Sequence, residues 1–190
     1  MSPRTEQQFE TIRNEKIKQI KDTALQLFSE YGYENTSISS IVKEAGISKG
    51  LLYHYFSGKE ELLKEIMVGG LKEFLAHLKI ENAGSIKKEE LIEFIDGNLI
   101  SLKKNTDYYR LYFALAFQPG IQKLFEQELM SIFTAVFEKF MLYFKQKNES
   151  SPYVKARFLL AVFDGIGIHY IADPIGFPLD EIRNLIVEQL

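Results

Sequence analysis

The segment Ser48–Phe56 gathers side chains that could contact an anionic or apolar partner. It reads Ser-Lys-Gly-Leu-Leu-Tyr-His-Tyr-Phe. Tyrosine hydroxyls and a histidine ring can donate hydrogen bonds to phosphate oxygens, and a leucine side chain suits contact with a thymine methyl group. The residue types therefore suggest a surface that binds nucleic acid.

Helical geometry decides which of these side chains point outward and can contact a partner. In a helix that begins at Lys49 and turns about 100° per residue, Leu52 and Phe56 point to one side and form its buried face. The opposite side carries Gly50, Leu51 and His54, with Tyr53 and Tyr55 at its rim. Lys49 lies only about 40° from the centre of the buried face. It could therefore reach DNA only by swinging out from the first turn.

Gly50 has two interpretations. A glycine inside a helix costs about 0.5–1 kcal/mol relative to alanine, and close approach of another backbone, such as DNA, is one reason to accept that cost. Exposed aromatic rings beside it are also unexpected on an idle surface. Alternatively, Tyr53 and Tyr55 pack against neighbouring helices and Gly50 is the remnant of a turn.

Two short helices joined by a glycine turn would position these side chains. Thr36 or Ser37 can cap a first helix that carries Ile38, Ile41, Val42 and Ala45 on one face, and Gly46 ends it. Ser48 can cap the second helix. This arrangement, from Thr36 to Phe56, is typical of a helix-turn-helix. A longer helix ending at Gly32 precedes it, with an apolar stripe of Ile17, Ile20, Ala24, Leu27, Phe28 and Tyr31. Ser57 and Glu60 form a capping box that starts the next helix.

Apolar residues recur at helical spacing through the rest of the chain, and no two-residue alternation indicates a strand. The fourth helix has a stripe of Leu63, Ile66, Gly70, Phe74 and Leu78, and Asn82–Ser85 is a polar break. Further helices are predicted at about 87–104, 107–118, 121–147, 152–172 and 179–190. We therefore predict an all-α fold of about nine helices. It divides into an N-terminal extension (1–12), a three-helix helix-turn-helix DNA-binding domain (13–73) and a C-terminal helical bundle (74–190).

Composition narrows the functional class. Of the 190 residues, 46 % are hydrophobic and 26 % are charged, which is ordinary for a globular protein, and the net charge of −3 argues against a strongly cationic nucleic-acid binder. The absence of cysteine excludes disulfides and thiolate chemistry. No secretory signal and no membrane-spanning run is found. We expect a cytoplasmic protein with no membrane partner and no cofactor or metal.

The residues that form these elements resemble the TetR family of bacterial repressors. The likeness is carried by Ile47-Ser-Lys-Gly-Leu-Leu-Tyr-His-Tyr-Phe-Ser-Gly-Lys-Glu-Glu-Leu-Leu63 and by Thr36-Ser-Ile-Ser-Ser-Ile-Val-Lys-Glu-Ala-Gly46 before it. Upstream, Ala24-Leu-Gln-Leu-Phe-Ser-Glu-Tyr-Gly-Tyr33 is similar to the end of that family's first helix. The resemblance covers about residues 13–73. It departs from the family at His54-Tyr55, where many relatives have Tyr-His, and at Leu51, where a small or polar residue is common.

The resemblance implies a role for each matched position. Ser37, with Thr36, should offer a hydroxyl and backbone amides to phosphate at the start of the second helix. Ser48, Lys49, Gly50 and Leu51 should lie in the major groove. Tyr53 and His54, and also Tyr55, should reach the DNA backbone, and Lys59 should pair with a phosphate. The partner would be double-stranded DNA with a palindromic operator, bound by a homodimer.

The aromatic-rich second half suggests an effector site. In TetR-like proteins this region is a bundle around a ligand cavity, and a pocket of aromatic rings with a few polar groups suits a flat or greasy molecule. We expect a small hydrophobic or aromatic effector near Tyr109, Tyr112, Phe113, Phe133, Phe137 and Tyr170. The same rings could instead be plain core. His169 is expected to be structural, and Asp164 to be capped or paired locally.

Dimerisation and switching are the remaining expectations. Gly165 and Gly167 within 161–172 would allow close helix approach, and the last helix adds Ile182, Leu185, Ile186 and Leu190. The resemblance implies that two such helices per subunit form a four-helix dimer interface. A ligand that tilts the fourth helix would change the spacing of the DNA-binding heads. Gly69-Gly70 could serve as a bend in that helix or could only permit tight packing.

Two other classes of function compete with this one. An enzyme would need a repeated carboxylate–histidine set or a nucleotide- or acyl-transfer motif, and Glu73 and His77 stand alone. We therefore predict no enzymatic activity. A second alternative keeps the fold but has the protein act through protein partners without specific DNA. The operator, the effector and the regulated genes are not encoded in these patterns.

Overall fold

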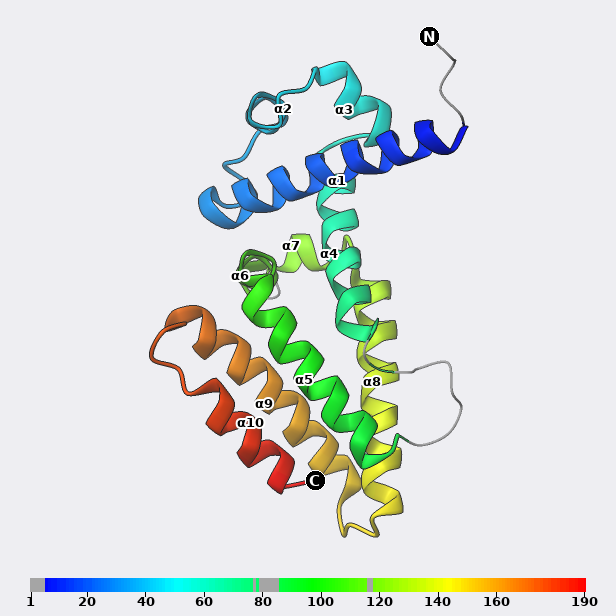
Figure 1. Cartoon of the computed structure of the whole chain (residues 1–190), viewed down its shortest axis with the longest axis vertical. Coiled ribbons are helices and arrows are strands. Elements are labelled where there is room, and N and C mark those ends of the chain that lie inside the picture. Colours follow the sequence, from blue (N-terminus) through cyan, green and yellow to red (C-terminus); the bar gives the residue numbers. More distant parts are fainter. Residues whose placement is uncertain (1–5, 77, 79–85, 116–117) are drawn as a thin grey trace. The chain divides into compact units, whose positions relative to one another are not determined.

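The computed structural model describes residues 6–76, 78, 86–115 and 118–190, and in these ranges the chain is helical with no strand. Figure 1 shows the ten helices of the described ranges. They are α1 (Glu6–Tyr31), α2 (Ile38–Glu44), α3 (Lys49–Tyr55), α4 (Lys59–Ala76), α5 (Lys88–Lys104), α6 (Thr106–Leu115), α7 (Pro119–Gln122), α8 (Glu126–Gln146), α9 (Pro152–Ala172) and α10 (Leu179–Glu188). The predicted all-α class is confirmed. Residues 6–12 of the predicted N-terminal extension continue α1.

The chain folds as two compact units, Met1–Met67 and Val68–Leu190. The α4 helix contributes residues to both, because the division falls within it. The first unit contains α1, α2 and α3, and the second contains α5 to α10.

The first unit is built on one apolar stripe of α1. Ile20, Ala24 and Phe28 recur at helical spacing and are fully buried. The short helices and the residues that cap their ends also contribute buried side chains to this unit, namely Ile41, Ala45, Leu52 and Phe56. Tyr31 was predicted to belong to the stripe but is 56 % exposed. It lies in the last turn of α1, just before the chain leaves the helix.

Two glycines end helices in the left-handed conformation. Gly32 has φ +85° and follows α1, and Gly46 has φ +62° in the turn between α2 and α3. At the second turn, the Ile47 amide donates to the Val42 carbonyl at 3.0 Å. This is the bond of a Schellman motif, which satisfies a free carbonyl at the helix end and reverses the chain tightly. The predicted turn at Gly46 is thereby confirmed.

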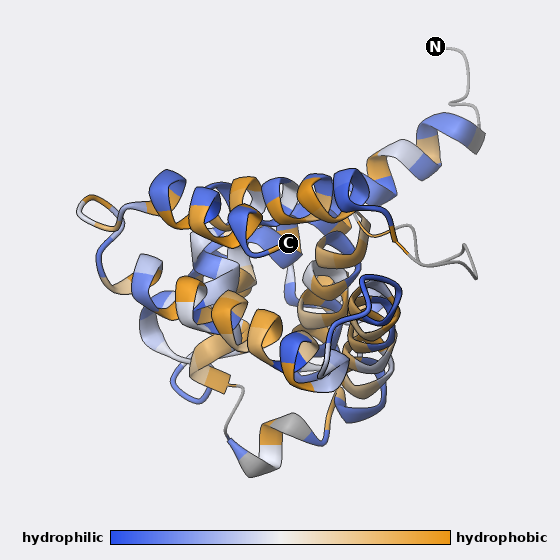
Figure 2. Ribbon diagram, turned by 90° about the horizontal axis from the view of Figure 1, so that it is seen from below, coloured by the Kyte–Doolittle hydropathy of each residue, from blue (hydrophilic) through white to orange (hydrophobic). Residues whose placement is uncertain are grey.

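The second unit packs around the aromatic residue Phe94 of α5. Its ring contacts Phe74, Phe140 and Phe163 edge-on, with centroids 5.3–5.8 Å apart. In Figure 1, α5 lies among α8, α9 and α10. Arg183 of α10 donates to both carboxylate oxygens of Asp96 on α5, at 2.7 and 2.8 Å. Figure 2 shows hydrophobic and hydrophilic residues alternating along the helices, as amphipathic packing requires.

The helix boundaries differ from the prediction in two places. The segment predicted as one helix at 121–147 is divided into α7 and α8, because Phe125 leaves helical geometry and is 1 % exposed. Leu78 is buried, as its place in the predicted stripe of α4 indicated, but α4 ends at Ala76. The predicted break at 82–85 lies outside the described residues.

No described helix combines the length and the apolar character that crossing a bilayer would require.

Candidate nucleic-acid interface

The start of α2 is fixed by its own serines. The Ser37 hydroxyl accepts from the Ser40 amide at 3.0 Å, and the Ser37 amide donates to the Ser40 hydroxyl at 3.1 Å. This reciprocal capping box leaves Ser37 at the surface, while its neighbour Thr36 is 4 % exposed. The Thr36 hydroxyl lies 2.9 Å from the Gly32 carbonyl and 3.2 Å from that of Leu27. The Thr36 hydroxyl, predicted to face phosphate, instead holds the end of α1.

The start of α3 is fixed in a similar way. The Ser48 hydroxyl accepts from the Leu51 amide at 3.1 Å, as an N-cap does. Lys49 follows it and is exposed, with its ammonium 5.9 Å from the centre of the Tyr53 ring one turn later. From the turn of about 100° per residue we predicted that Lys49 would lie close to the buried side of this helix. In the first turn the long side chain extends outward instead and lies along the exposed ring.

The outward side of α3 is open. Gly50, Tyr53 and His54 are exposed, and Tyr53 keeps 48 % of its surface free. Leu51 and Tyr55 are half-buried. No atom lies within 4 Å of where a β-carbon would stand at Gly50. Packing within the protein therefore does not require a glycine there.

Tyr55 is held from two sides. The Arg13 guanidinium of α1 lies 5.9 Å from the centre of its ring, and the His54 ring contacts it edge-on at 5.0 Å. Arg13 thus brings a positive charge from α1 beside α3. Sequence reasoning missed this residue, because the register of α1 against α3 is a tertiary feature.

Lys59 opens α4 and is bound within the first unit. Its ammonium donates to the Tyr33 carbonyl at 2.8 Å and lies 4.2 Å from the centre of the Tyr33 ring. Burial, followed by the negative charges of Glu60 and Glu34, raises the pKa of Tyr33 to about 12. The side chain that we predicted to pair with phosphate ties the start of the α1–α2 connection to α4.

The capping of α4 differs from the prediction by one residue. The Glu61 carboxylate, not that of Glu60, accepts from the Ser57 amide, at 2.5 Å. Hydrogen bonds from the Ser57 hydroxyl and amide lower the pKa of Glu61. A glutamate at position 60 or at position 61 can reach the free amides of the first turn. The sequence alone therefore did not tell which of the two carboxylates forms the cap.

The six residues predicted to bind an effector fall into separate groups. Tyr109, Tyr112 and Phe113 lie together on α6, with Tyr112 and Phe113 rings 5.1 Å apart. Phe133 and Phe137 stack at 6.2 Å on α8, and the Arg157 guanidinium of α9 lies 5.5 and 5.7 Å from their centres. Tyr170 contacts Phe177 at 6.4 Å.

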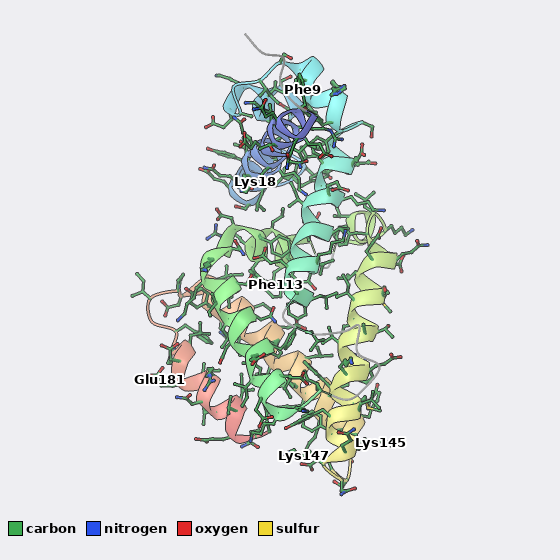
Figure 3. All side chains as sticks on the ribbon, turned by 45° about the vertical axis from the view of Figure 1, so that its right-hand side comes forward. Phe9, Lys18, Phe113, Lys145, Lys147 and Glu181 are labelled. Atoms are coloured by element: carbon green, nitrogen blue, oxygen red, sulfur yellow. The ribbon has the colours of Figure 1, made fainter. Side chains whose placement is uncertain are left out.

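The α6 group faces α9. A β-carbon on Gly167 would stand 2.7 Å from the Phe113 ring, so the glycine admits that ring (Figure 3 labels Phe113). Burial raises the pKa of Tyr112 to about 12, with a smaller contribution from the negative charge of Asp164. Burial also raises the pKa of Asp164. In the described part of the chain, its carboxylate makes no ion pair or hydrogen bond, contrary to the expected local pairing.

Gly70 belongs to the same kind of contact. A β-carbon there would overlap the Tyr108 ring. This contact favours the interpretation that Gly70 permits tight packing over the interpretation that it bends α4.

The helices predicted to form a dimer interface present an apolar strip on α9. Val154, Phe158 and Ile168 are 61 %, 61 % and 47 % exposed. The strip, at spacings of three and four residues, comprises Val154, Phe158, Ala161, Gly165, Ile168 and Ala172. Of the four C-terminal residues predicted for the interface, Leu185 is 60 % exposed, whereas Ile186 is buried and Ile182 and Leu190 pack against the core.

Residues 20–66, which span this helix-turn-helix, match the family of "Bacterial regulatory proteins, tetR family". The match covers the helix-turn-helix and not the second unit. The chain is also 26 % identical over 179 residues to the HTH-type transcriptional regulator PksA of Bacillus subtilis, covering 91 % of this chain and 87 % of that one. That relative is named as a transcription regulator, and the residues matched by the family are those that form the helix-turn-helix here.

Solved structures share the fold over nearly the whole chain. FadR from Bacillus subtilis in complex with stearoyl-CoA matches with a TM-score of 0.73 at 18 % identity, over 90 % of this chain and 95 % of that one. A regulator from Saccharomonospora viridis in complex with choline matches with a TM-score of 0.69 at 21 % identity, over 92 % and 95 %. At this identity the likeness shows a shared fold that includes the second unit, and it carries no ligand with it.

Proposed function

We propose that this tetR-family regulator is a repressor that binds a palindromic operator as a homodimer and is released by a small effector in its second unit. The observation that supports the DNA-binding face best is the open side of α3, where Gly50, Tyr53 and His54 are exposed without serving the core.

The contacts with DNA follow from where each group lies. Ser48, Lys49, Gly50 and Leu51 enter the major groove at the start of α3, and Tyr53 and His54 donate to phosphates. Ser37 offers phosphate the free amides of α2. Thr36 acts behind it by positioning that turn. Tyr55 is half-buried, so it contributes to DNA binding by holding His54 and by placing Arg13 near the DNA backbone.

The homodimer uses the apolar strip of α9. An isologous contact of two such strips would bury the side chains that are now exposed, and Leu185 of α10 would add to its edge. A two-fold dimer places its recognition helices about 34–36 Å apart, one turn of DNA. This predicts a palindrome whose half-sites are about 10 base pairs apart from centre to centre.

The effector site lies among the aromatic residues of the second unit. The α6 group is the part that supports this, since it combines aromatic rings with tyrosine hydroxyl groups and lies against α9 at Gly167. The cluster of Phe133, Phe137, Tyr153 and Arg157 is exposed except for Phe137, which packs against the core. It fits the neighbourhood of the dimer strip better than an enclosed effector site. Because α4 contributes residues to both units, we propose that it transmits the effect of the ligand. A DNA-bound regulator of this kind would act in the cytoplasm.

The test is a gel shift with the DNA upstream of the protein's own gene, compared with an unrelated duplex of equal length and base composition. We expect a retarded band that only the upstream DNA forms at physiological salt. Equal retardation of both duplexes, or of neither, would contradict operator binding. The alternative, action through protein partners without specific DNA, predicts no difference between the duplexes.

A further inference from the structure

Gly165 is a glycine of α9 that packing within the subunit does not require. No atom lies within 4 Å of where its β-carbon would stand, whereas a β-carbon on Gly167 would meet the Phe113 ring of α6. Gly165 is helical and does not have a positive φ. A glycine inside a helix is less favourable than an alanine, so a close approach from outside the helix is the usual reason to find one there. The open space at Gly165 therefore suits a side chain that comes from another molecule.

The apolar strip of α9 contains such a side chain. Phe158 is 61 % exposed and lies seven residues before Gly165. On a helix that turns about 100° and rises about 1.5 Å per residue, the two positions share one face and lie about 10 Å apart along the axis. The Phe158 ring is thus too far from Gly165 of its own subunit to fill the space, but a second copy of the chain can bring its ring there.

Two charged side chains flank the same strip without a partner. The α9 helix carries one lysine, one arginine and one aspartate, which are Lys155, Arg157 and Asp164. Lys155 forms an ion pair with Glu149 at 2.8 Å. Arg157 and Asp164 are exposed, and in the described part of the chain neither forms an ion pair. Both lie on one flank, about 60° and 80° from the centre of the strip, and about 10 Å apart along the axis, which is too far for pairing within one helix.

The ring and the charges require the same register between two copies of α9. When identical helices pack antiparallel about a two-fold axis, each flank of the strip faces the same flank of the partner, and the axis lies midway between residues that face each other. Phe158 facing the partner's Gly165 places the axis beside Ala161. Arg157 facing the partner's Asp164 places it there as well. A parallel pair would set each side chain at the level of its own copy, so it would join neither the ring to the glycine nor the opposite charges.

We propose that two copies of the chain pack their α9 helices antiparallel about a two-fold axis at Ala161. The Phe158 ring of each subunit fills the space beside the partner's Gly165. The Arg157 guanidinium of each subunit pairs with the partner's Asp164, so the dimer contains each contact twice. This inference rests on the proposed function and names the contacts by which the chain selects a second copy of itself.

The rest of the strip fits this register. Val154 and Ile168, which are 61 % and 47 % exposed, face each other across the axis and cover apolar surface. The Arg157 guanidinium lies 5.5 and 5.7 Å from the ring centres of Phe133 and Phe137 on α8. These rings restrict the side chain before a partner binds, so the pairing costs less rotamer freedom.

Charge exchange tests the ion pair by sedimentation equilibrium of the full-length protein. Arg157→Glu sets two carboxylates against each other at both ends of the interface, and Asp164→Arg sets two guanidinium groups against each other. We expect each variant alone to weaken the dimer at least tenfold, because like charges oppose each other across the interface. An equimolar mixture of the two variants should recover most of the affinity as a heterodimer, because both of its pairs then have opposite charges.

The matched control reverses two exposed charges of α8 that are also seven residues apart. Glu138→Arg and Lys145→Glu change the net charge as the test variants do. Each control variant should dimerise as the wild type does, and mixing the two should bring no gain. Circular dichroism shows that every variant is folded.

Gly165→Leu tests the fit of the ring without a change of charge. Its β-carbon meets no atom of its own subunit within 4 Å, so thermal stability of the subunit should be kept. The leucine occupies the space of the partner's Phe158 ring and should weaken the dimer at least tenfold. Adding Phe158→Ala to the same chain should recover affinity, because the smaller residue makes room for the leucine.

Two outcomes would overturn the inference. One is a wild-type dimer whose charge variants stay as tight as the wild type. The other is charge variants that do not recover on mixing, together with a Gly165→Leu variant that Phe158→Ala does not rescue. Operator binding is measured on the same preparations. An operator-binding dimer without these recoveries would refute only this inference, and a dimer with them that binds no operator would refute only the proposed function.

Discussion

Gly50 is the residue at which stability and DNA binding should respond to one methyl group in opposite directions. A β-carbon there meets no atom within 4 Å, so Gly50→Ala should raise the free energy of unfolding by about 0.5–1 kcal/mol. The same methyl group stands where a DNA backbone or base edge would approach, so operator affinity should fall. Chemical denaturation and fluorescence anisotropy check the two effects. Gly120→Ala, also in open space, should leave DNA affinity unchanged.

Lys59 should show a double role. Lys59→Ala removes the bond to the Tyr33 carbonyl and should cost about 1 kcal/mol of unfolding free energy. If the ammonium also meets a phosphate, the slope of log affinity against log salt should become shallower by about 1. Lys72→Ala, an exposed lysine of α4, is the control. A loss of stability with an unaltered salt slope would make Lys59 purely structural.

Tyr33 should make stability fall at high pH. Its pKa is raised from 10 to about 12 in the folded protein, so the folded state holds the phenol proton more tightly than the unfolded state. This contribution is fully present below pH 10 and is lost as the pH rises towards 12. Denaturation at about pH 9 and about pH 11 should show a smaller decrease for Tyr33→Phe than for the wild type. Equal decreases would contradict the assignment.

For single residues, the sequence predicted which side chains are exposed better than it predicted which groups they contact. The helical wheel placed Gly50 and His54 outward, because the spacing of Leu52 and Phe56 determines which side of so short a helix is buried. It could not predict that Thr36 is turned inward or that Lys59 bonds to Tyr33. Those contacts depend on where α1 ends relative to α4, which no local pattern contains.

Among the elements, the turn between α2 and α3 depends on backbone conformation alone. A β-carbon at Gly46 would meet no atom within 4 Å, but the residue has a φ of +62°. Gly46→Ala should therefore cost about 1–2 kcal/mol of unfolding free energy. Gly50→Ala has the opposite sign and serves as its matched comparison. Thermal unfolding of both variants tests this. A neutral Gly46→Ala would mean that the turn relaxes without cost.

Helix ends marked by glycine or serine were predictable, since Gly32, Gly46, Ser37 and Ser48 each act through local backbone chemistry. The division between α7 and α8 was not. The apolar periodicity runs through Phe125, whose ring is buried where the backbone leaves helical geometry. For the same reason the six aromatic candidates of the second unit could not be divided into inner and outer groups from their spacing.

For the whole molecule, the apolar strip of α9 predicts the oligomeric state. Phe158 is 61 % exposed, so Phe158→Glu should not disturb the core but would place a charge in the proposed interface. Light scattering should show a dimer for the wild type and a monomer for the variant at micromolar concentration. Glu188→Ala on α10 is the surface control. A wild-type monomer, or a variant that remains a dimer, would exclude this strip as the interface.

The claim that the exposed side of α3 binds DNA is tested most directly by a double substitution on that side. Tyr53→Ala with His54→Ala leaves the buried Leu52 and Phe56 in place. It is compared with Lys18→Ala and Asp22→Ala, which removes an exposed ion pair of α1 without changing the net charge. In anisotropy titrations with the upstream operator, we predict that the α3 variant loses more than tenfold in affinity, on the scale of about 1–3 kcal/mol per lost contact, while remaining folded by circular dichroism. The α1 variant should bind as the wild type does. Unchanged affinity in a folded α3 variant would contradict the account.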